Sequence, residues 1–163
     1  TGLQEFVNRY GDISQRYSVE KKNFASQPFA EMLIALFPEN SISIDSKVDT
    51  ICADPLLLKQ VMINLLKNAI EACANHETPC INLTISSITH NKNEQEISIE
   101  IKDNGQGIAN IDNLFVPFYT TKDSGHGIGL NLCQNIVEQH GGRLTLTNNK
   151  NEGVTAQVVL PYK

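Results

Sequence analysis

The run Ile97-Ser98-Ile99-Glu100-Ile101-Lys102-Asp103-Asn104-Gly105-Gln106-Gly107 joins an alternating strand to a glycine-rich turn. Alternation puts the isoleucines on one face of the strand, which predicts that this face is buried. Asp103 ends the strand, so we expect its side chain at the edge of the sheet, near the helices. Gly105 and Gly107 permit positive φ and let a flat ligand approach the backbone closely. The carboxylate could accept a hydrogen bond from an exocyclic amine such as that of adenine, although a plain Asp-Asn-Gly turn is the alternative on this run alone.

Alternating apolar residues predict further strands on both sides of this run. Residues 81–85 and 97–101 predict an antiparallel hairpin with a polar loop at 90–95. Shorter strands are expected at 42–44, 48–52, 144–146 and 154–158. Because helices separate pairs of strands, the predicted class is α+β, a two-layer sandwich in which about three helices cover one face of a mixed, mostly antiparallel sheet that carries a long lid loop.

A strongly apolar helix is predicted from Asp54-Pro55 to about Ala74. The Asp54 carboxylate can cap free backbone amides, and Pro55 has no N–H to leave unsatisfied. Apolar residues fill one half of this helix, and Asn64 and Asn68 lie four residues apart along its border. Asparagine is a mediocre helix former, so the pair needs an explanation, and both a functional site and an ordinary solvated face stay open.

Alternating glycines in Gly125-His126-Gly127-Ile128-Gly129-Leu130 precede another apolar helix, which ends at Gly141-Gly142. The unpaired amides and positive dipole end of such a helix start suit phosphate oxygens. The preceding segment is not a clean strand and the run does not end in Gly-Lys-Ser/Thr, so neither a dinucleotide fold nor a phosphate loop is favoured. Residues 108–124 predict a long loop of the kind that covers ligands, and Lys122 within it can reach phosphate.

Composition and charge are typical of one soluble globular domain. The 163 residues are 40% hydrophobic and 19% charged, with a net charge of −5 and no Lys/Arg cluster, so there is no electrostatic case for nucleic acid. No apolar run is long enough to span a bilayer and no signal peptide opens the chain, so we expect a cytoplasmic location without direct membrane contact. The four cysteines have no CxxC spacing, which favours reduced thiols.

The first residues predict a helix with a narrow apolar seam. Apolar side chains recur at three- and four-residue steps between Leu3 and Tyr17. The seam fits packing on the same domain or against a second helix, and we interpret residues 1–18 as the tail of a larger helical element. A polar linker is expected at 19–27, and Pro28 opens the next helix.

Four motifs in this order resemble those of sensor histidine kinases. The motifs are Asn64-Leu65-Leu66-Lys67-Asn68-Ala69, Asp103-Asn104-Gly105-Gln106-Gly107-Ile108, Leu114-Phe115-Val116-Pro117-Phe118-Tyr119-Thr120-Thr121-Lys122 and Gly125-His126-Gly127-Ile128-Gly129-Leu130. They are similar to the N, first glycine, F and second glycine boxes, and Gly141-Gly142 and Gly153-Val154-Thr155 also match. Residues 28–161 therefore resemble the catalytic and ATP-binding domain of nitrogen-regulation-type kinases, within the superfamily shared with gyrase and chaperone ATPases.

The resemblance implies roles for individual residues. Asn68 would ligate Mg²⁺, with Asn64 helping to place the metal or its waters, and Asp103 would receive the adenine amino group with support from Thr155. Asn64 and Lys122 would serve the transfer itself, Lys122 by neutralising phosphate charge. The remaining contacts to ATP would come from the glycine and F boxes: Gly105, Gly107, Ile108, Thr121, Lys122, Gly125, His126, Gly127, Ile128, Gly129 and Leu130.

The resemblance also implies a reaction and partners. The γ-phosphate of ATP would pass to a histidine on the protein's own dimerisation domain, and then to an aspartate in the receiver domain of a response regulator. The four histidines of this chain lack the acidic neighbour that follows the family's phosphoacceptor. Residues 1–18 would be the remnant of a dimerisation helix, 19–27 a linker and 28–163 the catalytic domain, in a parent kinase that could attach to the inner face of the membrane.

Two alternatives to a kinase stay open. One is a nucleotide-binding module without transfer activity. The other is an ATPase of the gyrase or mismatch-repair type, but those relatives carry a glutamate in place of Asn64. A neutral amide cannot take a proton from water, so hydrolysis should be poor. His126 stands where a small residue such as threonine is more usual, and its role is open.

Overall fold

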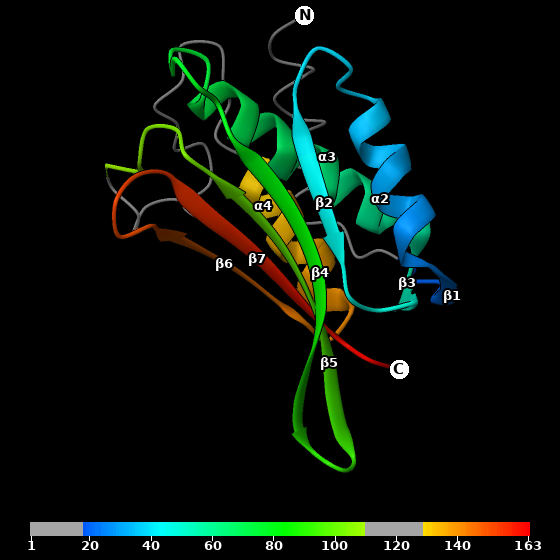
Figure 1. Ribbon diagram of the computed structural model, residues 1–163. Helices are drawn as coiled ribbons and strands as arrows, with labels where there is room; N and C mark the ends of the chain where they lie inside the picture. Colours follow the sequence, from blue (N-terminus) through cyan, green and yellow to red (C-terminus); the bar gives the residue numbers. More distant parts are fainter. Residues whose placement is uncertain (1–17, 110–128) are drawn as a thin grey trace, which may run out of the picture.

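The computed structural model describes residues 18–109 and 129–163. A five-stranded sheet forms one layer, and α2 (Ser26–Ala35), α3 (Pro55–Ala72) and α4 (Gly129–Gln139) lie together on one of its faces (Figure 1). The predicted α+β sandwich is confirmed for this part of the chain, whereas the lid loop falls mostly outside it. None of the described helices is both long and apolar enough to cross a bilayer.

The strand order places Asp103 at the end of the central strand. The sheet runs β2 (Ile42–Ser46), β4 (Ile81–Asn91), β5 (Glu94–Asp103), β7 (Val154–Pro161) and β6 (Arg143–Asn148). β2 pairs with β4 in parallel, and the other neighbours are antiparallel, with Ile85 opposite Ile99 in the central hairpin. Because β5 is flanked on both sides, its last residue is enclosed by neighbouring elements.

The core lies between this hairpin and α3. Ile97, Ile99 and Ile101 are each 1% exposed, as their alternation predicts. Above them lies the apolar face of α3, which is made of Leu58, Val61, Met62, Leu65, Leu66 and Ala69. Full burial of one such side chain contributes about 1.5 to 3 kcal/mol. A slip of one residue in β5 would turn all three isoleucines to the opposite face of the sheet, away from α3, so the core fixes the position of Asp103.

The linker predicted at 19–27 is wrong in part. Strand β1 (Lys22–Ala25) pairs antiparallel with β3 (Thr50–Ala53), and α2 begins at Ser26 rather than at Pro28. The four residues of β1 carry no alternating pattern, and their backbone partners lie far along the sequence. Tertiary pairing therefore creates this strand, and the folded unit includes residues 22–27.

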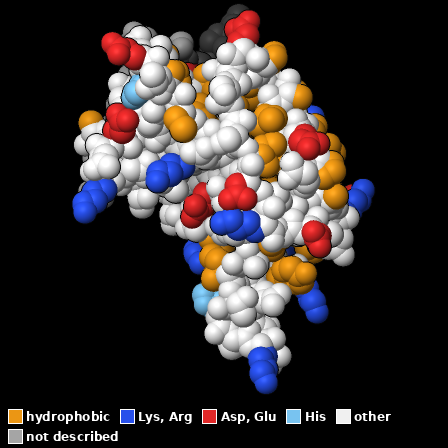
Figure 2. Space-filling model, viewed as in Figure 1, with side chains coloured by type: hydrophobic (Ala, Val, Ile, Leu, Met, Phe, Trp, Pro, Cys, Tyr) orange, Lys and Arg blue, Asp and Glu red, His pale blue; other side chains and the backbone are white. Residues whose placement is uncertain are grey.

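The polar loop predicted at 90–95 is also too long. β4 continues to Asn91 and β5 begins at Glu94, so a two-residue turn joins them. The end of this hairpin projects from the body of the molecule (Figures 1 and 2). Residues 89–95 are exposed, so neither face of the ribbon needs apolar side chains, and the period-2 signal disappears there although the strands persist.

Candidate functional site

Asp103 lies at the end of β5 and is buried, with 6% of its surface exposed. Its Oδ1 accepts hydrogen bonds from the backbone N–H of Gly105 at 3.0 Å and of Val154 at 3.2 Å. Within residues 18–109 and 129–163, Oδ2 receives no hydrogen bond. Burial raises the pKa of this carboxyl above its ordinary value, and the two backbone hydrogen bonds lower it by less. The turn and β7 thus hold one oxygen and leave the other available as an acceptor.

The turn after Asp103 is packed against the end of α3. Neither Gly105 nor Gly107 adopts the positive φ that we expected these glycines to permit. A Cβ at Gly105 would instead lie 2.3 Å from the carbonyl oxygen of Ala72, and the N–H of Gln106 donates to that oxygen at 3.0 Å. A Cβ at Gly107 would lie 3.0 Å from Asn148 Oδ1. Position 105 must therefore be glycine because the end of α3, rather than a ligand, lies so close to it.

The β6–β7 turn holds Asp103 from the other side. Asn149 Nδ2 donates to the carbonyl oxygen of Asp103 at 3.2 Å, and Thr155 Oγ1 donates to Asn149 Oδ1 at 2.6 Å. Gly153 has φ +85°, and a Cβ there would lie 1.9 Å from the same carbonyl oxygen. Thr155 thus lies beside Asp103, and it acts on the backbone of Asp103 through Asn149.

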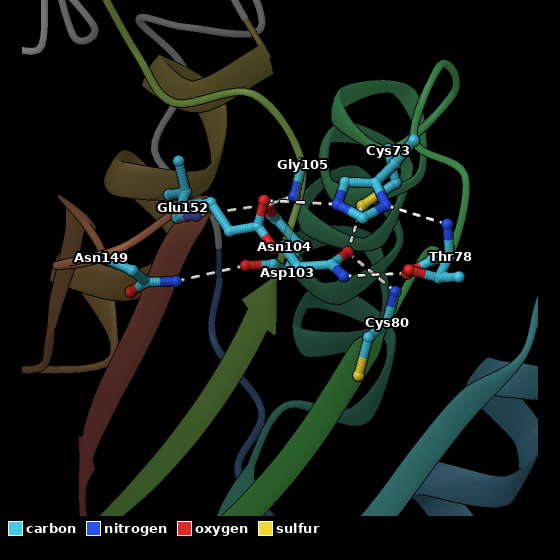
Figure 3. Close-up of polar contacts among 10 residues, drawn as sticks. Cys73, Thr78, Cys80, Asp103, Asn104, Gly105, Asn149 and Glu152 are labelled. Atoms are coloured by element: carbon cyan, nitrogen blue, oxygen red, sulfur yellow. Dashed lines mark hydrogen bonds and ion pairs between the residues drawn. The ribbon is translucent and has the colours of Figure 1, made fainter.

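The connection between α3 and β4 encloses the end of β5 on its far side (Figure 3). Asn104 Oδ1 accepts from the N–H of Cys80 at 2.8 Å, and its Nδ2 donates to the carbonyl oxygen of Thr78 at 2.9 Å. His76 Nδ1 accepts from the N–H of Thr78 at 3.0 Å, so its Nε2 carries the proton and donates to Glu152 Oε2 at 3.3 Å. Residues from two distant connections therefore meet across the Asp103 turn.

Asparagines that the sequence analysis did not single out carry much of this arrangement. Asn148 Oδ1 accepts from the N–H of Ile108 at 2.7 Å, and its Nδ2 donates to the carbonyl oxygen of Ile108 at 3.0 Å. Asn104 and Asn149 make the contacts given above. All three lie at or just after the end of a strand, where asparagine side chains replace backbone partners. That placement was the available signal in the sequence.

Asn64 and Asn68 lie half-buried on α3. The Asn64 side chain interacts with the thiol of Cys133 on α4, and burial raises the pKa of that thiol to about 12. Asn68 is one turn further along α3 and also has a partner. The i, i+4 spacing continues from Asn68 to Ala72, whose carbonyl oxygen holds the Asp103 turn. Asn64 and Asn68 therefore lie on one face of α3, along a line that runs from the contact with α4 to the Asp103 turn.

Only the end of the second glycine run lies within the described residues. Gly129 begins α4, where a Cβ would meet no atom of the described residues within 4 Å, and Leu130 packs against the core. Asn131 follows in the first turn and is buried, but its Nδ2 has no acceptor among the described residues. The remaining predicted site residues lie outside the described part of the chain: Thr121, Lys122, Gly125, His126, Gly127 and Ile128.

The fold is the one found in histidine kinase catalytic domains. The catalytic domain of histidine kinase ThkA superposes with a TM-score of 0.74 and 28% identity, over 88% of this chain and 96% of that one. Histidine kinase ThkA in complex with the response regulator protein TrrA superposes with a TM-score of 0.76 and 25% identity, over 99% of this chain and 48% of that one.

The sequence relatives agree with this class. Sensor protein FixL of Bradyrhizobium diazoefficiens is 36% identical over 121 residues, which cover 73% of this chain and 23% of FixL. Sensor histidine kinase ZraS of Escherichia coli is 39% identical over 111 residues, which cover 67% of this chain and 22% of ZraS. Residues 53–163 match the model of the histidine kinase-, DNA gyrase B- and HSP90-like ATPase family, and the chain belongs to that family. It spans less than a quarter of the length of these curated relatives.

Proposed function

We propose that this chain binds ATP together with Mg²⁺ and is the catalytic part of a protein-histidine kinase. The observation that carries the proposal is the half-satisfied carboxylate of Asp103. Its Oδ1 is engaged by two backbone amides, and its Oδ2 accepts nothing from the described residues. A buried carboxylate accepts hydrogen bonds only, so the exocyclic amine of adenine is a fitting donor. Membership of an ATPase family supports the same ligand.

The start of α4 is the proposed phosphate end of the site. The first amides of a helix have no partner within it and the helix dipole favours negative charge there, so the N–H groups of Gly129 and Leu130 are the proposed phosphate donors. Asn131 adds a buried donor that lacks an acceptor among the described residues, which fits a neighbouring polyanion. We extend the proposal to Thr121, Lys122, Gly125, His126, Gly127 and Ile128, which rest on the motif match alone.

Asn68 and Asn64 are the proposed ligands for Mg²⁺ and its waters. Mg²⁺ prefers oxygen ligands and keeps several waters, so amide oxygens fit this ion. When bound, Mg²⁺ would neutralise phosphate charge, and the side chains of α3 would position it.

A kinase fits this site better than a hydrolase does. Asn64 stands where gyrase-type relatives carry a catalytic glutamate, and an amide cannot serve as the base for water. The γ-phosphate would go to a histidine on the protein's own dimerisation domain and then to a response regulator. The structure of ThkA with TrrA is a kinase–regulator complex of a similar protein, which supports this choice of partner. Such a relay places the protein in the cytoplasm.

Calorimetry with a non-hydrolysable ATP analogue tests the ligand. We expect micromolar to sub-millimolar affinity, about −8 to −5 kcal/mol, with a contribution from Mg²⁺ that Asn68→Ala removes. Asp103→Asn keeps the shape of the side chain and should nearly abolish binding, because the amide can present its NH₂ group to the adenine amine. Equal titrations for the wild type and Asp103→Asn would contradict the adenine assignment.

A second experiment separates the kinase from its alternatives. The chain is mixed with its separately prepared dimerisation hairpin and labelled ATP, while phosphate release is followed over many turnovers. Labelled hairpin with little free phosphate supports the kinase. Rapid phosphate release without labelling supports a gyrase-type ATPase, and binding without either supports a module that has no transfer activity.

A further inference from the structure

A group of buried polar contacts lies where α3 begins and α4 ends, at the opposite end of α3 from the Asp103 turn. We name Glu20, Lys21, Asp54 and His140 the anchor cluster. Asp54 is 8% exposed and His140 is 3% exposed. Neither residue belongs to the proposed nucleotide site, so these buried polar groups need an explanation of their own.

His140 links the two helices through one neutral imidazole. Its Nδ1 lies 2.8 Å from the carbonyl oxygen of Ile136 on α4, which can only accept, so Nδ1 carries the proton. Its Nε2 then accepts from the backbone N–H of Asp54 at 3.0 Å. Both ring nitrogens are satisfied in this tautomer, and the ring joins the last turn of α4 to the first residue before α3.

Asp54 joins the start of α3 to the segment that precedes β1. Its Oδ1 caps the helix by accepting from the N–H of Leu56 at 3.1 Å and of Leu57 at 3.2 Å, as the Asp-Pro motif predicts. Its Oδ2 accepts from the N–H of Glu20 at 3.0 Å. Burial works against the charged form, yet these backbone hydrogen bonds hold the pKa of Asp54 below its ordinary value. The charged carboxylate therefore binds helix and segment with strong hydrogen bonds.

The same segment also reaches the end of α4. Lys21 Nζ donates to the carbonyl oxygen of His140 at 3.2 Å. Glu20 is thus bound to the start of α3 and Lys21 to the end of α4. A displacement of residues 18–21 would act on both helices at once.

The anchor cluster and the proposed site lie at opposite ends of one helix pair. Asn68 is about 21 Å from Asp54 along the axis of α3, at 1.5 Å per residue. α4 begins at Gly129 in the proposed site and ends beside His140. Between the two ends, Cys133 Sγ lies 3.8 Å from the carbonyl oxygen of Val61, so the helices also touch midway.

We propose that the anchor cluster couples residues 18–21 to the nucleotide site, with His140 as the positioning residue that sets how α3 and α4 lie together. The inference rests on the proposed function, because it needs a ligand that touches both helices. A nucleotide held by Asn68 and by the start of α4 fits only one distance between α3 and α4. The anchor cluster joins the other ends of these helices and so restricts the distances that they can adopt. Coupling between equilibria is reciprocal, so bound nucleotide also makes the opening of the anchor cluster less favourable.

The first arm of the test measures affinity. A non-hydrolysable ATP analogue is titrated by calorimetry into the 163-residue chain as wild type, His140→Phe and His140→Gln. Phenylalanine keeps a planar ring without donor or acceptor, whereas glutamine keeps one of each. We expect about 5-fold weaker binding for His140→Phe and less than about 2-fold for His140→Gln. The matched control is His90→Gln, on the exposed hairpin, which should bind as the wild type does.

The second arm measures amide exchange of the wild type with and without saturating analogue. We expect the N–H groups of Glu20 and Asp54 to exchange about 5-fold more slowly with the analogue. A purely structural role of His140 would lower thermal stability without linking these amides to the ligand. If His140→Phe does not fold, Asp54→Asn replaces it, because asparagine still caps α3 but offers one oxygen fewer to Glu20.

The outcomes separate the two proposals. A wild type that fails to bind the analogue refutes the proposed function, and the coupling falls with it. A wild type that binds, together with a folded His140→Phe or Asp54→Asn variant of equal affinity, overturns the coupling alone. Unchanged exchange of the Glu20 and Asp54 amides at saturation does the same.

Discussion

Replacing Gly105 with alanine should destabilise the protein more than a surface substitution does. The new Cβ would lie 2.3 Å from the carbonyl oxygen of Ala72, 2.5 Å from its carbonyl carbon and 2.9 Å from its Cβ. Ordinary contacts of a Cβ begin near 3.4 Å, so the turn must move by about 1 Å, as overpacked sites do. That movement breaks the hydrogen bond from Gln106 to Ala72. Overpacking and the lost bond together cost about 2 to 4 kcal/mol.

Urea denaturation of the purified variant measures this cost. At roughly 2 to 4 °C per kcal/mol for a chain of this size, the midpoint of thermal unfolding should fall by about 4 to 16 °C. Gly129→Ala is the matched control, because no atom of residues 18–109 or 129–163 lies within 4 Å of a Cβ there, and its stability should stay equal or rise slightly. A Gly105→Ala variant within about 0.5 kcal/mol of the wild type would refute the close packing of the turn on α3.

Three further predictions concern stability and reactivity. Burial raises the pKa of Asp103 above its ordinary value of 3.8, so ionisation of this carboxyl lowers the free energy of unfolding as pH rises from 3.8 through the folded-state pKa. Asp103→Asn should flatten that part of the pH–stability curve, as measured by urea unfolding. Gly153→Ala should cost about 2 kcal/mol or more by the same assay, because φ is +85° and its Cβ would meet the Asp103 carbonyl oxygen; a smaller loss contradicts that backbone. A thiol reagent at pH 8 should label exposed Cys80 in the native protein and buried Cys133 only after unfolding, as peptide mapping by mass spectrometry would show.

The central part of the fold follows from local patterns that the sequence displays. The alternating isoleucines of β5 are buried as predicted, and Asp54-Pro55 begins α3 with the expected cap. Such patterns can be recognised in the sequence because a neighbouring layer buries one face of each element, and the residues on that face are apolar. β1 and the projecting end of the β4–β5 hairpin gave no such signal. Their strands exist through backbone pairing, and Phe24 is the one residue of β1 that packs against the core.

The candidate site likewise has residues that could be predicted from the sequence and contacts that could not. The motif residues Asp103 and Asn68 could be chosen because carboxylate and amide groups in those positions suit a nucleotide and its metal. The partners of those residues could not, because Asn149 and Val154 reach Asp103 from about 50 positions further along the chain through β7 pairing. The anchor cluster is of the same kind, since Asp54 and His140 are 86 positions apart.

The sequence by itself determined which residues are candidates for the chemistry, the class of the fold and the family resemblance, because side-chain type and short spacings are local properties. Only the tertiary structure decided why position 105 must be glycine, which oxygen of Asp103 stays available and what joins the ends of α3 and α4. Those properties depend on distances between segments remote in the chain, and such distances exist only once the core has formed.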